Sequence, residues 1–171
     1  MRTIFIILAA VVLLSAPALY ADDLWEYYPS GNEVLNFAFQ GDYVWCATEG
    51  SLVRWNKQDI TYRQYTMNDG LLSNRVKDVF VDRDGRLWIV TLAGIQTFDG
   101  STFTSYTQEN IGLGNDQYVL AIDQAPDGAM WFGITGGLLR FDGTTWTIYN
   151  KDNSALNVDY VNIFAIDNDG V

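Results

Sequence analysis

The sequence predicts an all-β protein, a β-propeller made of four-stranded antiparallel blades. A repeat predicts this fold, because a tryptophan recurs with a period of 43 residues at Trp45, Trp88 and Trp131. The composition agrees: short runs rich in β-branched and aromatic residues alternate with turn residues, and no stretch shows a convincing helical period. Repeats of about 40 to 50 residues that each form one small sheet are typical of propellers, in which every blade buries its faces against its neighbours.

The second repeat defines its strands most clearly. Asp84-Gly85 and Asp99-Gly100 are pairs that tolerate the positive φ of a tight hairpin, so they are expected to join the first strand to the second and the third to the fourth. Because both faces of a blade are covered, we expect the repeated tryptophan to pack between blades rather than to contact a ligand. We expect the four strands, from the propeller axis outward, at residues 76–82, 86–91, 93–98 and 102–107.

The repeats predict an incomplete propeller over residues 22–171. Trp25 and Tyr28 have the aromatic spacing of the outer strands, so residues 22–30 are expected to be the outer strand of the closing blade, which removes an open sheet edge. The next tryptophan of the period would follow Val171, so we expect the chain to be truncated before ring completion. Three blades are expected at residues 31–75, 76–118 and 119–160, and residues 161–171 are expected to start the next one.

The first 21 residues predict a secretory signal peptide. They contain one cation, Arg2, then an apolar run from Ile4 to Leu14, then small residues that allow cleavage after Ala18 or Ala21. The alternative is an uncleaved anchor helix, if the low-polarity stretch continues to Tyr20. In either case the propeller is exported, and a periplasmic or extracellular location is expected.

Composition excludes several classes of function. The chain has no histidine, which removes Ser-His-Asp triads, imidazole acid-base catalysis and most zinc sites. Its formal net charge of −11 repels phosphate backbones, so nucleic acid is not an expected partner. Asp82 and Asp84 lie close together, but hairpin-turn duty is favoured over calcium because this turn supplies few oxygen ligands. Cys46, the only cysteine, is expected to be a small buried hydrophobe. We expect no catalytic residue, metal or cofactor.

The stretch Asn74–Gly100 resembles the two-component-regulator propeller repeat. That repeat has an Asp-Gly pair shortly before a tryptophan, then Gly-Leu, then an aromatic residue before a second Asp-Gly, as in DGRLWIVTLAGIQTFDG. Three positions depart from the Trp-x-Gly-Thr element of that repeat: Val90 and Ala47 replace its glycine, and Ile134 replaces its threonine in the third unit, where Thr135 follows. Members of the family are exported bacterial propellers that often form the ligand-sensing part of hybrid sensor kinases, so the resemblance implies a non-catalytic sensor module.

The resemblance also implies partners. The ligand it implies is a small molecule, with carbohydrate breakdown products as one class, and membrane attachment would come only through a C-terminal part outside this sequence, with signalling domains beyond it. Two alternatives stay open: a secreted polysaccharide-active enzyme, such as a lyase or glycosidase on a propeller scaffold, and a surface adhesion or scaffold module. Fold alone does not decide between them.

Candidate binding residues lie in the loops that lead into the innermost strands, at one mouth of the propeller channel. These loops differ between repeats while the scaffold around them repeats, as a binding rim on a repeated scaffold would. Unselected surface loops would vary in the same way. The candidate residues are Asn74, Arg75, Asp116, Gln117, Asp159 and Tyr160.

Overall fold

The computed structural model describes residues 33–167, which form twelve strands in three four-stranded sheets. The expected signal peptide and the expected outer strand at residues 22–30 lie outside the described residues. The strands are β1 (Val34–Gln40), β2 (Tyr43–Thr48), β3 (Leu52–Asn56), β4 (Tyr62–Tyr65), β5 (Val76–Val81), β6 (Leu87–Thr91), β7 (Gly94–Phe98), β8 (Phe103–Thr107), β9 (Val119–Gln124), β10 (Met130–Ile134), β11 (Gly137–Phe141) and β12 (Trp146–Tyr149).

Each sheet follows the order of the chain, and every pairing is antiparallel. The strands of the second repeat begin and end within one residue of the positions expected from the sequence. Gly85 and Gly100 have φ values of +79° and +102°, so the two Asp-Gly pairs form the tight turns that the sequence predicts. Helical structure in residues 33–167 is confined to two short 3-10 turns, η2 (Met67–Asp69) and η3 (Glu109–Ile111). The all-β prediction is confirmed.

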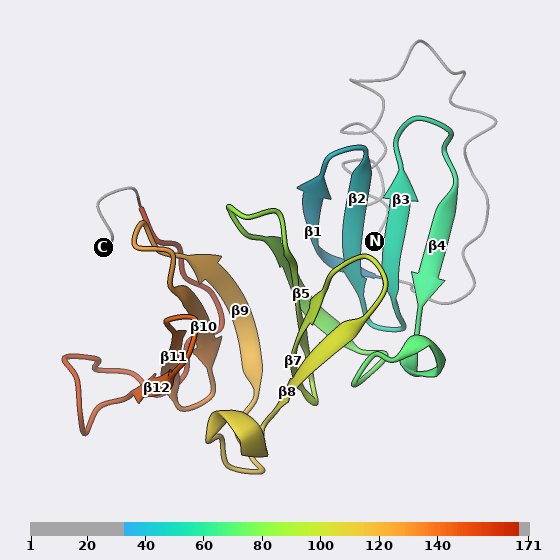
Figure 1. The fold of residues 1–171 in the computed structure, drawn as a ribbon. Helices are drawn as coiled ribbons and strands as arrows, with labels where there is room; N and C mark the ends of the chain where they lie inside the picture. Colours follow the sequence, from blue (N-terminus) through green and yellow to red (C-terminus); the bar gives the residue numbers. More distant parts are fainter. Residues whose placement is uncertain (1–32, 168–171) are drawn as a thin grey trace.

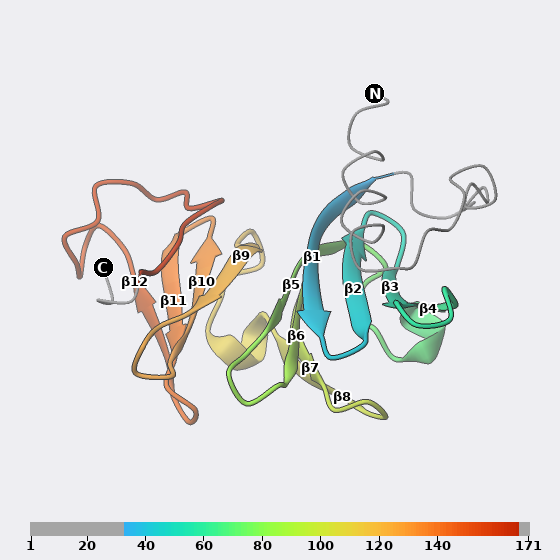
Figure 2. The ribbon, with the colours of Figure 1, turned by 90° about the horizontal axis from the view of Figure 1, so that it is seen from above.

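The three sheets stand side by side in sequence order (Figure 1). Seen from above, β1, β5 and β9 lie nearest to one another while β4, β8 and β12 point outward (Figure 2). Contacts agree, because β1 packs beside β5 and β5 beside β9. The first strand of each sheet is therefore the innermost one, and the sheets form an arc of a propeller. Within residues 33–167 this arc is not a closed ring.

A layer of aromatic rings joins each sheet to the next. Trp45 and Trp88 are 2% and 1% exposed. The ring of Trp45 lies 5.7 Å from that of Phe98, and the ring of Trp88 lies 6.0 Å from that of Phe141. Each interface has its own buried apolar cluster built around one of these tryptophans. The interblade packing role predicted for the repeated tryptophan is confirmed at these two positions.

The third tryptophan of the period has a different environment. Trp131 is only half-buried, and no further sheet of the described chain stands against its face of the third sheet. Its ring stacks on that of Tyr149 at 5.3 Å and lies 5.9 Å from the guanidinium of Arg140. Trp131 therefore provides a comparison for a repeated tryptophan without the interface.

Cys46 is buried, with 5% of its surface exposed, as expected for a small hydrophobe. Burial raises the pKa of the thiol to about 11, because the thiolate would lose its hydration inside the sheet. The thiol is therefore protonated at neutral pH, and a protonated buried thiol is a poor nucleophile.

Removing one tryptophan of the aromatic layer tests how much that layer contributes to the free energy of unfolding. We expect Trp88→Ala to lower the free energy of unfolding by about 3 to 5 kcal/mol, because it empties a buried site between two sheets. Trp131→Ala is the matched control and should cost clearly less. Urea unfolding of both variants, followed by circular dichroism, measures the difference; equal costs would contradict the packing role.

The reactivity of the Cys46 thiol tests whether this side chain is buried and protonated. At pH 8 the folded protein should react with a thiol-specific disulfide reagent at least about tenfold more slowly than the protein unfolded in guanidinium, because thiolate is the reactive form. Absorbance of the released reagent measures both rates. A folded-state rate equal to the unfolded rate would show that the thiol is accessible and ionised.

Candidate functional site

The candidate residues lie at one end of the innermost strands. Asn74 and Arg75 directly precede β5, and Asp159 and Tyr160 directly precede Val161. The backbone N–H of Val161 donates to the carbonyl of Ile134 at 3.1 Å, which places this segment at the same end of the third sheet. Asp116 and Gln117 lie just before β9. Of the six residues, Gln117 is half-buried and the other five are exposed. We call this end of the sheets the rim.

Arg75 belongs to a charged cluster that links the first two sheets. Its guanidinium pairs with the carboxylate of Glu49, which also accepts from the ammonium of Lys77 at 3.0 Å. Glu49 follows β2, whereas Lys77 lies on β5. Two cations around one carboxylate leave a local net positive charge, which is unusual in a chain with a net charge of −11.

The other candidates make contacts within their own loops, except Asp116, whose backbone carbonyl accepts from the hydroxyl of Thr135, between β10 and β11, at 3.5 Å. Asn74 accepts from the backbone N–H of Met67 at 2.8 Å, and Gln117 accepts from that of Gly114 at 2.9 Å. Asp159 pairs with Lys151. Among the contacts of residues 33–167, no hydrogen bond or ion pair joins candidate residues of two different loops. The structure thus places the six at one end without bringing them into direct contact.

Tyr118 is a rim residue that the sequence reasoning missed. Because β5 begins at Val76 and β9 at Val119, Tyr118 stands in the place of Arg75, directly before an innermost strand. Its side chain is 40% exposed, and that of Tyr160 is 58% exposed. Counting back one residue from Val119, rather than two and three, would have found it. The equivalent rim positions are therefore Arg75, Tyr118 and Tyr160.

Asp78 is a second missed residue, and it lies inside the protein near the axis. It is 7% exposed and accepts from the side-chain amide of Asn36 on β1 and from the backbone N–H groups of Val79 and Ile122, the latter on β9. Burial raises its pKa to about 6, and the charge of Asp123 acts in the same direction. Because the neighbouring repeat has Ala121 in its place, the repeat pattern gave no signal for it. Asp78 ties the three innermost strands together.

The acids of the second hairpin turn serve structure. Asp82 accepts from the indole N–H of Trp88 at 2.8 Å and from the backbone N–H groups of Asp84 and Arg86 at 3.1 and 2.8 Å. The carboxylate oxygens of Asp82 therefore accept hydrogen bonds within the turn, in line with the structural role in the hairpin that was expected for it.

Among the residues that the structure describes, no group of three or more Cys, His, Asp or Glu side chains is placed to hold a metal ion. The same residues include no helix with the length and apolar character needed to span a membrane.

The fold and the rim define a β-propeller domain: successive four-stranded antiparallel sheets that pack through aromatic layers and direct their variable loops to one end. Residues 70–93, which contain β5 and β6, match the family model of the two component regulator propeller. The chain therefore carries the repeat of that family, and the resemblance seen in the sequence is confirmed.

Solved structures share this fold at low identity. One is the extracellular domain of BT3049 from B. thetaiotaomicron, described as a hybrid two component system; it has a TM-score of 0.63 and 20% identity over 78% of this chain and 20% of that chain. Another is catalytically inactive virginiamycin B lyase from Staphylococcus aureus with quinupristin, with a TM-score of 0.60 and 16% identity over 76% of this chain and 45% of that chain. The chain thus spans a fifth of the first structure and less than half of the second. A search of curated proteins finds no match.

The raised pKa of Asp78 predicts how stability depends on pH. Its pKa of about 6 in the folded protein lies above the ordinary value of 3.8, so the folded state binds this proton more tightly than the unfolded state. The free energy of unfolding should therefore gain on the order of 2 to 3 kcal/mol from this group as pH falls from about 7 to about 4.

Asp78→Asn tests that dependence because it removes the titrating group and keeps one acceptor oxygen. We expect the variant to lose this part of the pH dependence, whereas Asp152→Asn, at an exposed loop position, should keep it. Chemical unfolding at several pH values between 4 and 7.5 measures both. Identical pH profiles for Asp78→Asn and the native protein would rule out the assigned role.

Proposed function

We propose that this protein is an exported, non-catalytic ligand-binding propeller and the sensor part of a bacterial two-component signalling protein. The single observation that carries the binding role is the contrast at the rim. Val76 and Val119 are 0% and 1% exposed and repeat as scaffold, while the residues directly before them, Arg75 and Tyr118, differ from each other and are exposed. Solvent-facing variation on a fixed frame is how a repeated scaffold acquires a specific site.

The chemistry of the rim supports a small ligand with polar groups and a flat face. Tyr118 and Tyr160 offer exposed rings together with phenol hydroxyls, and Arg75 offers guanidinium donors beside Lys77. Rings of this kind stack on the apolar faces of sugars while the hydroxyls and the guanidinium bond to sugar oxygens. A carbohydrate-derived small molecule is therefore our proposed ligand class.

The signalling role is supported by the comparisons. The matching family model is described as a two component regulator propeller, and a structure of the same fold is the extracellular domain of a protein described as a hybrid two component system. We propose a periplasmic or extracellular location for this domain, with membrane attachment and downstream signalling domains in other parts of the full-length protein.

A second candidate function is enzymatic, because a lyase shares the fold at a TM-score of 0.60. That structure is of a catalytically inactive variant in which a histidine is replaced by alanine, and the 171 residues of this chain contain no histidine. Any catalysis on this domain would need acids or tyrosines instead. We favour the binding role for that reason.

Binding at the rim can be measured by calorimetry with a panel of mono- and oligosaccharides. For any sugar that binds, Arg75→Ala and Tyr160→Ala should each weaken affinity by about tenfold, the weight of one charge-assisted hydrogen bond or one stacked ring. Arg63→Ala, on the outer strand of the first sheet, is the control and should bind as the native protein does.

Two results would contradict the proposal. Unchanged affinity in both rim variants would remove the rim as the site. Cleavage of any sugar of the panel, detected by chromatography and abolished by substitution of one carboxylate, would show that the domain is an enzyme.

A further inference from the structure

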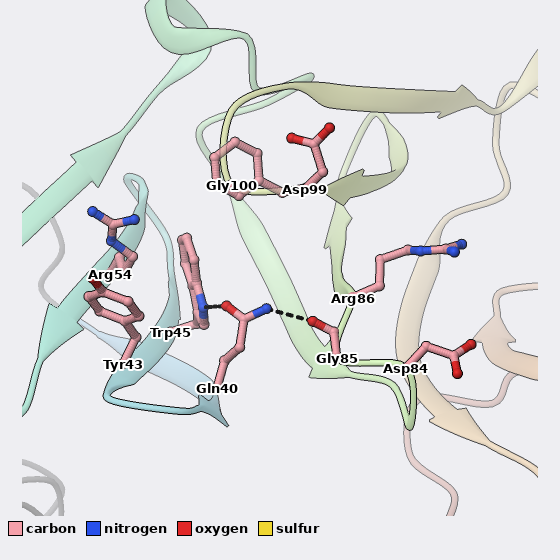
Figure 3. A pocket seen from close by; sticks show the side chains of 10 residues that line it. Gln40, Tyr43, Trp45, Arg54, Asp84, Gly85, Arg86, Asp99 and Gly100 are labelled. Atoms are coloured by element: carbon pink, nitrogen blue, oxygen red, sulfur yellow. Dashed lines mark hydrogen bonds between the residues drawn. The ribbon is translucent and has the colours of Figure 1, made fainter.

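A groove lies between the first two sheets at the end opposite the rim. It has a volume of about 340 Å³ and is lined from the first sheet by Tyr43, Trp45 and Arg54 and from the second by Phe98 and the turns at Asp84 and Asp99 (Figure 3). Because β5 has six residues between the rim and the turn at Asp84, the two places are roughly 20 Å apart. The groove is thus a separate site from the rim.

The floor of the groove is fixed by Gln40. Its amide oxygen accepts from the indole N–H of Trp45 at 2.8 Å, and its amide nitrogen donates to the carbonyl of Gly85 at 2.7 Å (Figure 3). One side chain therefore spans both walls and uses both ends of its amide. The groove is preorganised, so a ligand would not have to order it.

The guanidinium of Arg54 makes cation–π contacts with three aromatic rings. It lies 4.5 Å from the centre of the Tyr43 ring, 5.8 Å from that of Trp45 and 6.0 Å from that of Tyr65. Within residues 33–167 it makes no ion pair with a carboxylate. The rings fix the position of the cation but leave its hydrogen-bond donors without an anionic partner.

The third sheet contains an internal control for Arg54. Arg54 pairs with Trp45 across the strands as Arg140 pairs with Trp131, so the two arginines are equivalent. Arg140 is ion-paired with Asp127 at 2.9 Å and with Asp142 at 3.9 Å. In the first repeat the places of these two acids are taken by Gly41 and Asn56. The third sheet thus neutralises its arginine with two acids, and the first sheet lacks both.

The opposite wall carries two acids, Asp84 and Asp99, and one cation, Arg86, so its net charge is negative. Hydrogen bonds from the backbone N–H groups of Thr102 and Ser101 hold the pKa of Asp99 below its usual range, so its carboxylate is ionised. These bonds fall on one carboxylate oxygen, at 2.8 Å each. Neither Asp99 nor Asp84 forms an ion pair with a basic side chain in the described chain. The groove therefore holds Arg54 on one wall and an excess of carboxylates over cations on the other, and Arg54 forms no ion pair with either acid.

From this arrangement we infer that the groove binds a zwitterionic α-amino acid with an apolar side chain. The ligand carboxylate would pair with Arg54, its ammonium group would face Asp99, and its side chain would lie against the half-buried ring of Tyr43, above the buried rings of Trp45 and Phe98. A ligand with only an anionic group would be repelled by the acids, and a ligand with only a cationic group would be repelled by Arg54. A volume of about 340 Å³ fits one such molecule rather than a polymer.

Three ligands that differ only in charge test the inference on the native protein: L-phenylalanine, 3-phenylpropanoate and 2-phenylethylamine, measured by calorimetry or ligand-observed NMR. L-Phenylalanine should bind at least about tenfold more tightly than either analogue, because each analogue leaves one charged wall without its partner. L-Leucine should also bind. No binding of either amino acid, or equal binding of 3-phenylpropanoate, would overturn the inference.

Two variants locate the site. Arg54→Thr places at this position the residue that the second sheet has there, Thr97, and should weaken L-phenylalanine by about tenfold or more; Arg140→Thr is the matched control and should bind as the native protein does. Asp99→Asn keeps the turn acceptor and should lose the preference over 3-phenylpropanoate. Unchanged affinity in Arg54→Thr, with folding verified by circular dichroism, would place any binding elsewhere.

Discussion

Burial of an indole ring between two sheets is the constraint on which this structure depends. A single four-stranded sheet with apolar residues on both faces is not stable in water, because each face must be covered by another element. Trp45 and Trp88 supply the largest side chains at the two interfaces and are nearly completely buried. Each meets a phenylalanine from the third strand of the next sheet. The period of 43 residues therefore follows from this contact, because each unit must place a tryptophan on its second strand and an aromatic residue on its third strand at the same positions.

The axis of the arc imposes a different requirement. Neighbouring innermost strands belong to different sheets, so the structure uses side-chain hydrogen bonds to connect them. Asp78 accepts from Asn36 and from the backbone of Ile122, and Asp123 accepts from the backbone of Ile166 at 2.8 Å. Two acids thus provide the same kind of connection from different positions in their strands. A buried carboxylate with several donors is tolerable, but the cost of its burial remains and appears as the raised pKa of Asp78.

The sequence predicted what repeats and missed what does not. Strand positions and the packing role of Trp88 followed from periodicity, because a residue that recurs in equivalent contacts leaves a regular pattern. Asp78 has no equivalent acid in the next repeat, so its link across three strands appears only in three dimensions. Tyr118 could have been predicted from the sequence, but the candidates before Val119 were placed two and three residues ahead of the strand instead of one. The lack of an ion pair at Arg54 could not be predicted, because sequence alone does not show which acids reach which cations.

Equivalent positions also differ at the two ends of the sheets, as Arg75 and Tyr118 do at the rim, where the aromatic layers do not restrict the side chain. The interface of the first two sheets is bridged at both ends: by Glu49 and Arg75 at the rim, and by Gln40 and Gly85 at the groove. These bridges act on the same pair of sheets, whose separation is set between them by Trp45 and Phe98. A ligand that changed the spacing of the sheets at one end would therefore strain the bridge at the other. Because a packed aromatic layer resists gradual deformation, any influence between the ends would need a second discrete packing of that layer. The interface of the first two sheets is thus the place where binding at either end would have its structural effect.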